Sequence, residues 1–279
     1  MGHSIKTPLV SVIIPVYNRS SFVVSAVNSI LEQTYSHLEV ICIDDCSTDD
    51  SVILLQKIKD PRLKIYIQDK NQGIVSALTK GIELSQGSFI ARMDSDDLSM
   101  PDRIQEQINF LEENPDIDIC ATNIILYDLH GNQNGYWEDD IKNTTPEQIK
   151  KTLIQKNCIA HPTVVFRKSV FEYINYRHEY YLAEDWGLWL DANAFDFKIG
   201  KVAKPLLFYR VHPSSLNNQF TFGTKYLKAI RFKFKYLKTK FKYDELSKYD
   251  KSILISLLFN IICFPFDITL MRLINYLKH

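Results

Sequence analysis

Three carboxylates lie close together after one apolar run of the chain. Asp94, Asp96 and Asp97 occupy four consecutive positions with Ser95, separated by two residues from the apolar run 88–91. Carboxylates this close repel one another, and burial disfavours their charged form. A hard divalent cation prefers oxygen ligands and often takes further ones from substrate phosphates. The cluster therefore suggests a metal site, although a solvated turn before a helix has the same composition.

The first hundred residues contain the elements that position this cluster. Short β-rich runs alternate with segments of helical period. Strands are expected at 9–15, 38–45, 62–69 and 88–94. Strands joined by helices lie parallel, and ligands bind outside the carboxyl ends of such sheets. Segments 15–18, 44–45 and 94–97 fall at these ends, so they should meet at one edge.

The pattern changes after residue 117. Residues 117–140 suggest a hairpin with a turn rich in Gly and Asn. A helix at about 146–156, a short strand at 163–166 and an aromatic-rich helix at 185–195 are expected to follow. No linker or repeat interrupts the chain before residue 220, so 1–220 is interpreted as one α/β domain and 221–279 as a separate helical segment.

Composition narrows the class of protein. The 279 residues are 46% hydrophobic, which suffices for a sizeable core. The five cysteines are scattered without C-x-x-C spacing, so neither a disulfide framework nor a zinc site is indicated. The N-terminus lacks the pattern of a secretory signal, and a cytoplasmic protein is expected.

The chain lacks the usual glycine-rich phosphate loops. Neither G-x-G-x-x-G nor the P-loop pattern is present, which argues against ordinary dinucleotide and P-loop chemistry. The three strand ends offer other groups. Asp45 can accept a hydrogen bond from the N–H of a base, and Tyr17 can pack on a ring. A metal held by the aspartates can bind a diphosphate.

Five motifs in order resemble a known family. Residues 10–51, 71–104, 161–168 (HPTVVFRK), 183–190 (AEDWGLWL) and 209–212 (YRVH) look like the family 2 inverting glycosyltransferases of the GT-A fold. That fold is Rossmann-like, with a mostly parallel central sheet flanked by helices. Two departures are visible, because Cys46 stands where the family usually has Gly and Lys80 where it usually has Asn.

The resemblance implies a nucleotide-sugar donor, most often a UDP-sugar, with Mn²⁺ or Mg²⁺ bridging its diphosphate and a D-x-D motif. The implied donor-site residues are Pro15, Val16 and Tyr17 for the nucleoside, Asp45 for the base, Asp94 near the ribose, the adjacent Ser95, and Asp96 and Asp97 for the metal. His212 would complete the metal shell, as in some family members. His161 could be a metal ligand or could simply anchor a turn before Pro162, and Arg210 could contact phosphate or be a surface charge.

A second acidic pair, Glu184 and Asp185, opens the aromatic helix. Acids at a helix N-terminus complement the helix dipole, which is the simpler interpretation. Inversion, however, needs a base that deprotonates the acceptor hydroxyl. The family places an Asp here, so Asp185 is the expected base, with Glu184 as reserve or acceptor contact. Tyr181, Trp186 and Trp189 could stack on sugars, although the tryptophan spacing equally suits a core stripe.

The tail is basic and aromatic. Residues 222–279 contain 12 Lys and Arg against 4 Asp and Glu. Interleaved basic and aromatic residues in 222–243 suit a helix at an anionic membrane surface, and the apolar run 253–266 is too short to span a bilayer. The alternative is a solvated helix that packs back on the domain. No nucleic-acid module accompanies the segment.

The resulting hypothesis is an inverting hexosyltransferase of bacterial O-antigen or capsule synthesis, peripherally attached to the inner face of the plasma membrane. Its acceptor would be a glycan on a polyprenyl diphosphate. A sugar-nucleotidyltransferase is the enzymatic alternative, but it should carry a Gly-rich basic loop after its first strand. A phosphohydrolase would place its aspartates elsewhere, and a non-catalytic nucleotide-sugar-binding protein would not need Glu184 and Asp185.

Overall fold

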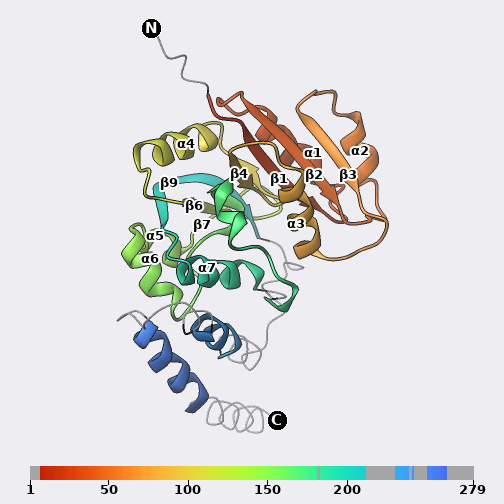
Figure 1. Ribbon diagram of the computed structural model, residues 1–279. Coiled ribbons are helices and arrows are strands. Elements are labelled where there is room, and N and C mark those ends of the chain that lie inside the picture. Colours follow the sequence, from red (N-terminus) through yellow and green to blue (C-terminus); the bar gives the residue numbers. More distant parts are fainter. Residues whose placement is uncertain (1–6, 181–182, 212–229, 239–240, 242–249, 263–279) are drawn as a thin grey trace, which may run out of the picture.

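The computed structural model describes residues 7–180, 183–211, 230–238, 241 and 250–262. In this part of the chain the strands form one sheet, ordered β3-β2-β1-β4-β8-β6-β9-β5, with β7 paired to β6 (Figure 1). The strands are β1 Val10–Val16, β2 Leu38–Asp44, β3 Leu63–Ile67, β4 Phe89–Arg92, β5 Leu98–Ser99, β6 Ile119–Tyr127, β7 Gln133–Tyr136, β8 Val165–Arg167 and β9 Ile199–Arg210. The helices are α1 Val23–Leu31, α2 Ser51–Lys57, α3 Ile74–Leu84, α4 Arg103–Glu113, α5 Glu138–Lys142, α6 Pro146–Leu153 and α7 Glu184–Ala194.

The first half of the sheet is parallel, as predicted from the alternating pattern. β1 pairs in parallel with both β2 and β4, and β2 pairs in parallel with β3. Side chains of β1 alternate between two apolar cores, because successive residues of a strand face opposite sides. Val12 and Ile14 pack in the core that includes α1 and α4, whereas Ile13 packs in the core that includes α3.

The second half of the sheet is mixed. β8 runs antiparallel to both β4 and β6, and β9 pairs in parallel with β6. The two-residue strand β5 follows Asp97 directly and pairs antiparallel with Leu207 and Phe208 of β9. This pairing brings the end of β9 beside the acidic turn after β4. The predicted hairpin is present as β6 and β7, although β7 is short.

The described helices of the C-terminal segment pack on the core that contains α7. Residues 230–238 and 250–262 are helical, and Figure 1 shows the first of these helices (blue) beside α7. Phe232 meets the ring of Trp186 edge-on, with centroids 5.7 Å apart. Phe232, Tyr236 and Ile253 belong to the same apolar core as α7. Within the residues described, no helix combines the length and apolarity needed to cross a membrane.

Candidate active site

The acidic turn between β4 and β5 brings three carboxylates together. Asp94, Asp96 and Asp97 each offer an oxygen, and these oxygens lie within 4.8 Å of one another. Asp97 Oδ1 accepts a hydrogen bond from the backbone N–H of Arg210 at 2.9 Å. Asp97 Oδ2 is buried and has no hydrogen-bond partner among the described residues. A buried charged acceptor without a donor is costly, so a bound cation fits this position.

Burial also raises the pKa of two carboxyl groups in this cluster, those of Asp94 and Asp97. It raises the pKa of Asp97 well above its ordinary value, and the charges of Asp94 and Asp96 raise it further. The pKa of Asp94 is raised by burial and lowered by Arg92. A divalent cation would favour the ionised form of each carboxylate that it contacts. The donor set therefore matches Mn²⁺ or Mg²⁺ in chemistry as well as in spacing.

Three arginines contact the acidic turn in different ways. Arg92 is buried and pairs with Asp94, with Nη1 3.0 Å from Oδ2. Arg19 Nε lies 3.1 Å from Asp96 Oδ2. Arg210 Nε donates to the carbonyl oxygen of Asp96 at 2.8 Å, and its guanidinium lies 4.4 and 4.5 Å from the rings of Phe22 and Tyr127. Arg210 thus holds the backbone of the turn.

The ends of β1 and β2 form the neighbouring part of the site. Tyr17 is 43% exposed, Pro15 is half-buried, and the side chain of Val16 is buried in the core. Val16 can therefore offer only its backbone to a ligand. Asp45 accepts hydrogen bonds from the backbone N–H groups of Gln72 and Gly73, each at 2.7 Å. These bonds anchor the Asp45 carboxylate to the loop before α3.

The loop after β2 keeps a glycine-like backbone at Cys46. Its φ is 62°, in the left-handed region that favours glycine. Ser47 stabilises this turn, because its N–H donates to Asp44 Oδ2 at 2.9 Å. The departure from the family pattern at this position therefore leaves the left-handed turn in place.

The second acidic pair lies at the start of α7. Asp185 Oδ1 accepts from the N–H of Trp186 at 2.7 Å, and Oδ2 accepts from Asn157 Nδ2 at 2.6 Å. Burial raises the pKa of Asp185, while these two bonds oppose the rise because they favour the ionised form. Burial and the charge of Asp185 raise the pKa of Glu184 to about 7.

Arg92 connects the two acidic groups electrostatically. Its charge lowers the pKa of Asp94, Glu184 and Asp185, so all three lie within its field. The sequence pattern assigned no role to Arg92 or to Asn157. Nothing in the local sequence singles out Asn157, which lies 28 positions from its partner.

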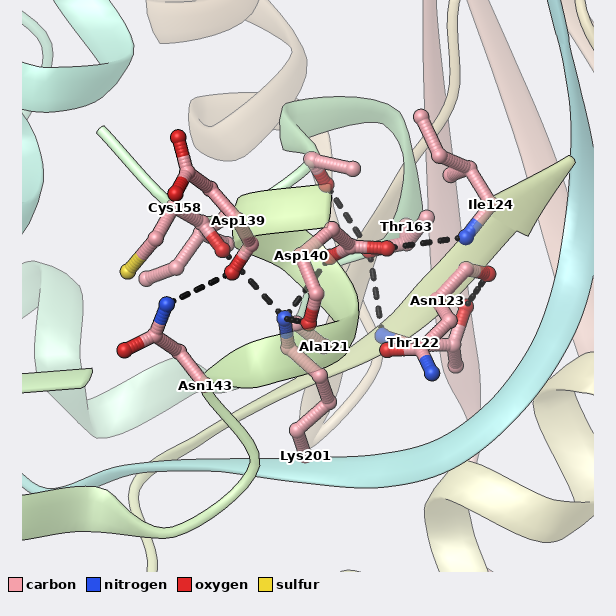
Figure 2. A network of polar contacts seen from close by, with 12 residues as sticks. Ala121, Thr122, Asn123, Ile124, Asp139, Asp140, Asn143, Cys158, Thr163 and Lys201 are labelled. Atoms are coloured by element: carbon pink, nitrogen blue, oxygen red, sulfur yellow. Dashed lines mark hydrogen bonds and ion pairs between the residues drawn. The ribbon is translucent and has the colours of Figure 1, made fainter. Parts of the chain in front are cut away.

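A buried ion pair contacts the segment that carries Asn157. Lys201 and Asp140 are both 0% exposed, with Nζ 2.7 Å from Oδ1 (Figure 2). Lys201 Nζ also donates to the carbonyl oxygen of Cys158, the residue after Asn157, and Asp140 Oδ2 accepts from the N–H of Ile124. The network thereby ties β6 and β9 to the segment that carries Asn157.

Several other predicted residues have buried side chains. His161 is buried, its Nε2 lies 2.7 Å from the Tyr176 hydroxyl, and burial lowers its pKa well below the ordinary value. Trp186 and Trp189 are buried in the core, so neither presents a face to a sugar. Ser95 is also buried. His212 and Tyr181 lie outside the described residues.

A family model and several curated proteins match this chain over more than half of its length. The family model described as "Glycosyl transferase family 2" matches residues 11–174. The chain is 33% identical over 214 residues to the O-antigen biosynthesis glycosyltransferase WbnJ of Escherichia coli, covering 74% of this chain and 81% of that protein. It is 32% identical over 218 residues to WfaP of Escherichia coli, a "UDP-Glc:alpha-D-GlcNAc-diphosphoundecaprenol beta-1,3-glucosyltransferase", covering 76% and 81%. The chain spans only 31% of a longer glycosyltransferase relative from Rickettsia bellii.

Solved structures share the fold. The structure of S. aureus TarS with UDP-GlcNAc superposes with a TM-score of 0.72 at 20% identity, covering 90% of this chain and 72% of that one. The mannosyltransferase PcManGT of Pyrobaculum calidifontis, solved with GDP-Man and Mn²⁺, gives 0.65 at 14% identity, covering 94% and 72%. The fold is therefore that of the GT-A glycosyltransferases. Together with the family match, it shows that this chain belongs to glycosyl transferase family 2 and is a glycosyltransferase.

Proposed function

We propose that the protein transfers a hexosyl unit from a UDP-sugar, with inversion and with Mn²⁺ or Mg²⁺, to a glycan acceptor on a polyprenyl diphosphate in O-antigen or capsule synthesis. The observation that carries the proposal is the pairing of two acidic sites around Arg92. The three-aspartate cluster suits a metal and a diphosphate. Asp185, within the same electrostatic field, suits an acceptor hydroxyl.

The residues of the proposed site have separate roles in binding and catalysis. Tyr17 packs on the base of the donor, and Asp45 accepts a hydrogen bond from it. A divalent cation held by Asp96 and Asp97 would neutralise charge on the departing diphosphate. Asp185 accepts the proton of the attacking hydroxyl. The donors from Asn157 and Trp186 favour the ionised form of Asp185, which a base requires.

The names of similar proteins support the choice of donor and acceptor. WfaP is named for UDP-Glc and a diphosphoundecaprenol acceptor, and a TarS structure contains UDP-GlcNAc. PcManGT, at lower similarity, was solved with GDP-Man and Mn²⁺. UDP is therefore the first nucleotide to test and GDP the second, and a lipid-linked acceptor is the first acceptor class.

Calorimetric titration tests the donor site directly. UDP, GDP and dTDP are titrated with and without Mn²⁺ into wild type, Asp96→Asn and Asp102→Asn. Asp102 is exposed and lies at the start of α4, so it controls for the loss of one nearby carboxylate. We expect Mn²⁺-dependent UDP binding in wild type and Asp102→Asn that is lost in Asp96→Asn. Failure of folded wild type to bind any nucleotide would refute the proposal.

The C-terminal helices are proposed to dock on an anionic membrane surface. In the helix at 250–262, Ile255, Leu258, Phe259 and Ile262 follow an i, i+3, i+4, i+7 spacing and are 51–68% exposed. The opposite face, with Ile253 and Leu257, is buried against the domain. An apolar face directed away from the core, flanked by basic residues, is typical of interfacial helices. This location would bring the enzyme to a lipid-linked acceptor.

The neighbouring helix presents a similar face. Arg231, Phe234 and Lys238 recur at helical spacing and are exposed, so basic and aromatic groups share one side. Co-sedimentation with vesicles containing anionic lipid tests the proposal, using Ile255→Ser/Phe259→Ser and the control Ile53→Ser. Ile53 is 53% exposed on α2, in another part of the protein. We expect only the double variant to lose binding, and unchanged binding would refute this role for the helix.

A further inference from the structure

Arg19 contacts the side chain of a proposed metal ligand. Its Nε lies 3.1 Å from Asp96 Oδ2, in a pair whose side chains are 34% and 14% exposed. The residue follows β1, and its backbone N–H donates to Ser51 Oγ at 2.8 Å. Its Nη1 donates to the carbonyl oxygen of Asn18 at 3.0 Å. The backbone N–H of Arg19 is therefore anchored to Ser51, while its head group bridges the carbonyl oxygen of Asn18 and the turn after β4.

The other two arginines at this turn are held more firmly. Arg92 is 4% exposed, and both of its terminal nitrogens contact Asp94. The guanidinium of Arg210 lies against two aromatic rings, and its Nε donates to the backbone carbonyl of Asp96. Arg19 is more exposed than Arg92, and it touches Asp96 through a single nitrogen. Among the arginines described at this turn, Arg19 is the one placed to exchange partners.

A cation and a guanidinium compete for the same carboxylate oxygen. A divalent ion bound by Asp96 would stand close to the positive charge of Arg19, and like charges at short range repel. A diphosphate placed beside that ion offers an alternative anion. Guanidinium groups bind phosphate oxygens well, because their planar donors match that geometry.

We propose that Arg19 competes with the divalent cation for Asp96 and, once displaced, binds the diphosphate of the nucleotide-sugar. This inference rests on the proposed function, since it assigns a role to a residue of the same donor site. Arg19 would then favour ordered binding of the metal and the nucleotide. It would weaken binding of the metal alone and strengthen binding of the nucleotide in the presence of the metal.

Two titrations with opposite expected signs test this assignment. Mn²⁺ alone, and UDP at saturating Mn²⁺, are titrated into wild type, Arg19→Gln and Arg62→Gln. Arg62 is a matched control because it also pairs with an aspartate, Asp60, and is 30% exposed. We expect Arg19→Gln to bind Mn²⁺ alone about two- to five-fold more tightly, as for loss of an exposed ion pair. It should bind UDP about ten-fold more weakly, as for loss of a charged hydrogen bond.

The outcomes separate this inference from the proposed function. Mn²⁺-dependent UDP binding by wild type supports the donor site whatever the variants do. With that binding present, unchanged or weaker Mn²⁺ affinity in Arg19→Gln would overturn the proposal that Arg19 competes with the cation for Asp96. Unchanged UDP affinity would overturn the proposal that the displaced Arg19 binds the diphosphate. Equal changes in Arg62→Gln would also overturn the assignment, because they would reflect net charge alone. Absence of UDP binding by wild type would refute the donor site and the inference together.

Discussion

The amide of Asn157 donates a hydrogen bond to Asp185 Oδ2 at 2.6 Å, and the orientation of this amide is set by a second bond. The backbone N–H of Ile159 donates to Asn157 Oδ1 at 3.1 Å, so the NH₂ group must face Asp185. A hydrogen bond to the ionised form of a carboxyl group lowers its pKa. Asn157 therefore acts on the proposed base as a positioning residue.

Replacing Asn157 by Leu should raise the pKa of Asp185 and move the acidic limb of kcat to higher pH. Near neutral pH, kcat should fall about ten-fold or more, because a hydrogen bond to a charged group is lost. The KM for the donor should stay unchanged. Asn114→Leu is a suitable control, since Asn114 bonds only locally to Phe110 at the end of α4. An equal loss of kcat at every pH would contradict this role.

Glu184 should make stability depend on pH. Its pKa rises from an ordinary value of 4.5 to about 7 in the folded protein. A carboxyl group with a raised folded pKa favours the folded state while it is protonated, and this contribution is lost as pH rises from 4.5 to 7. Glu184→Gln should therefore stabilise the protein at pH 8 but not at pH 4, by up to about 3 kcal/mol.

Urea denaturation of wild type and Glu184→Gln at both pH values measures this difference in the free energy of unfolding. Glu147→Gln provides a control, because Glu147 is an exposed acid that also lies in the first turn of a helix. A gain for Glu184→Gln that is the same at pH 4 and pH 8 would show that the protonation of Glu184 is not its cause.

Arg92→Met should destabilise the fold and leave Asp94 without its partner. Removing one member of a buried ion pair costs about 3 kcal/mol or more, and the lower end applies here because Asp94 is 28% exposed. Arg62→Met removes an arginine from a more exposed pair and should cost less than about 1 kcal/mol. Chemical denaturation at pH 7 compares the two. Equal losses would show that burial of Arg92 is not decisive.

The Lys201–Asp140 pair should behave as a unit. Lys201→Met leaves a carboxylate buried without a counter-ion and should cost about 3–5 kcal/mol. Adding Asp140→Asn removes that charge and should recover at least half of the loss. Lys198→Met, in an exposed pair with Asp116, should cause no measurable change. If the double variant is no more stable than Lys201→Met, the cost does not come from the unpaired charge.

The parallel half of the sheet was predictable from the sequence because its signals are local. Apolar runs such as those of β1 and β2 are long enough to indicate central strands, and the intervening helical periods imply parallel order. Parallel order then brings the ends of β1, β2 and β4 to one edge. The grouping of Tyr17, Asp45 and the three aspartates near that edge follows from topology alone. The mixed half was less predictable, since β5 and β8 contain only two and three residues.

The sequence by itself determined the family, the parallel strands and the acidic residues at their ends, because these depend on residue type and spacing along the chain. Only the tertiary structure decided which side chains act on those acids. Arg92 lies in the field of both acidic groups, Asn157 reaches Asp185 across 28 positions, and Arg19 meets Asp96 across 77. Such contacts arise from strand pairing and burial, so a charge or a hydrogen bond between distant residues leaves no periodic signal in the sequence.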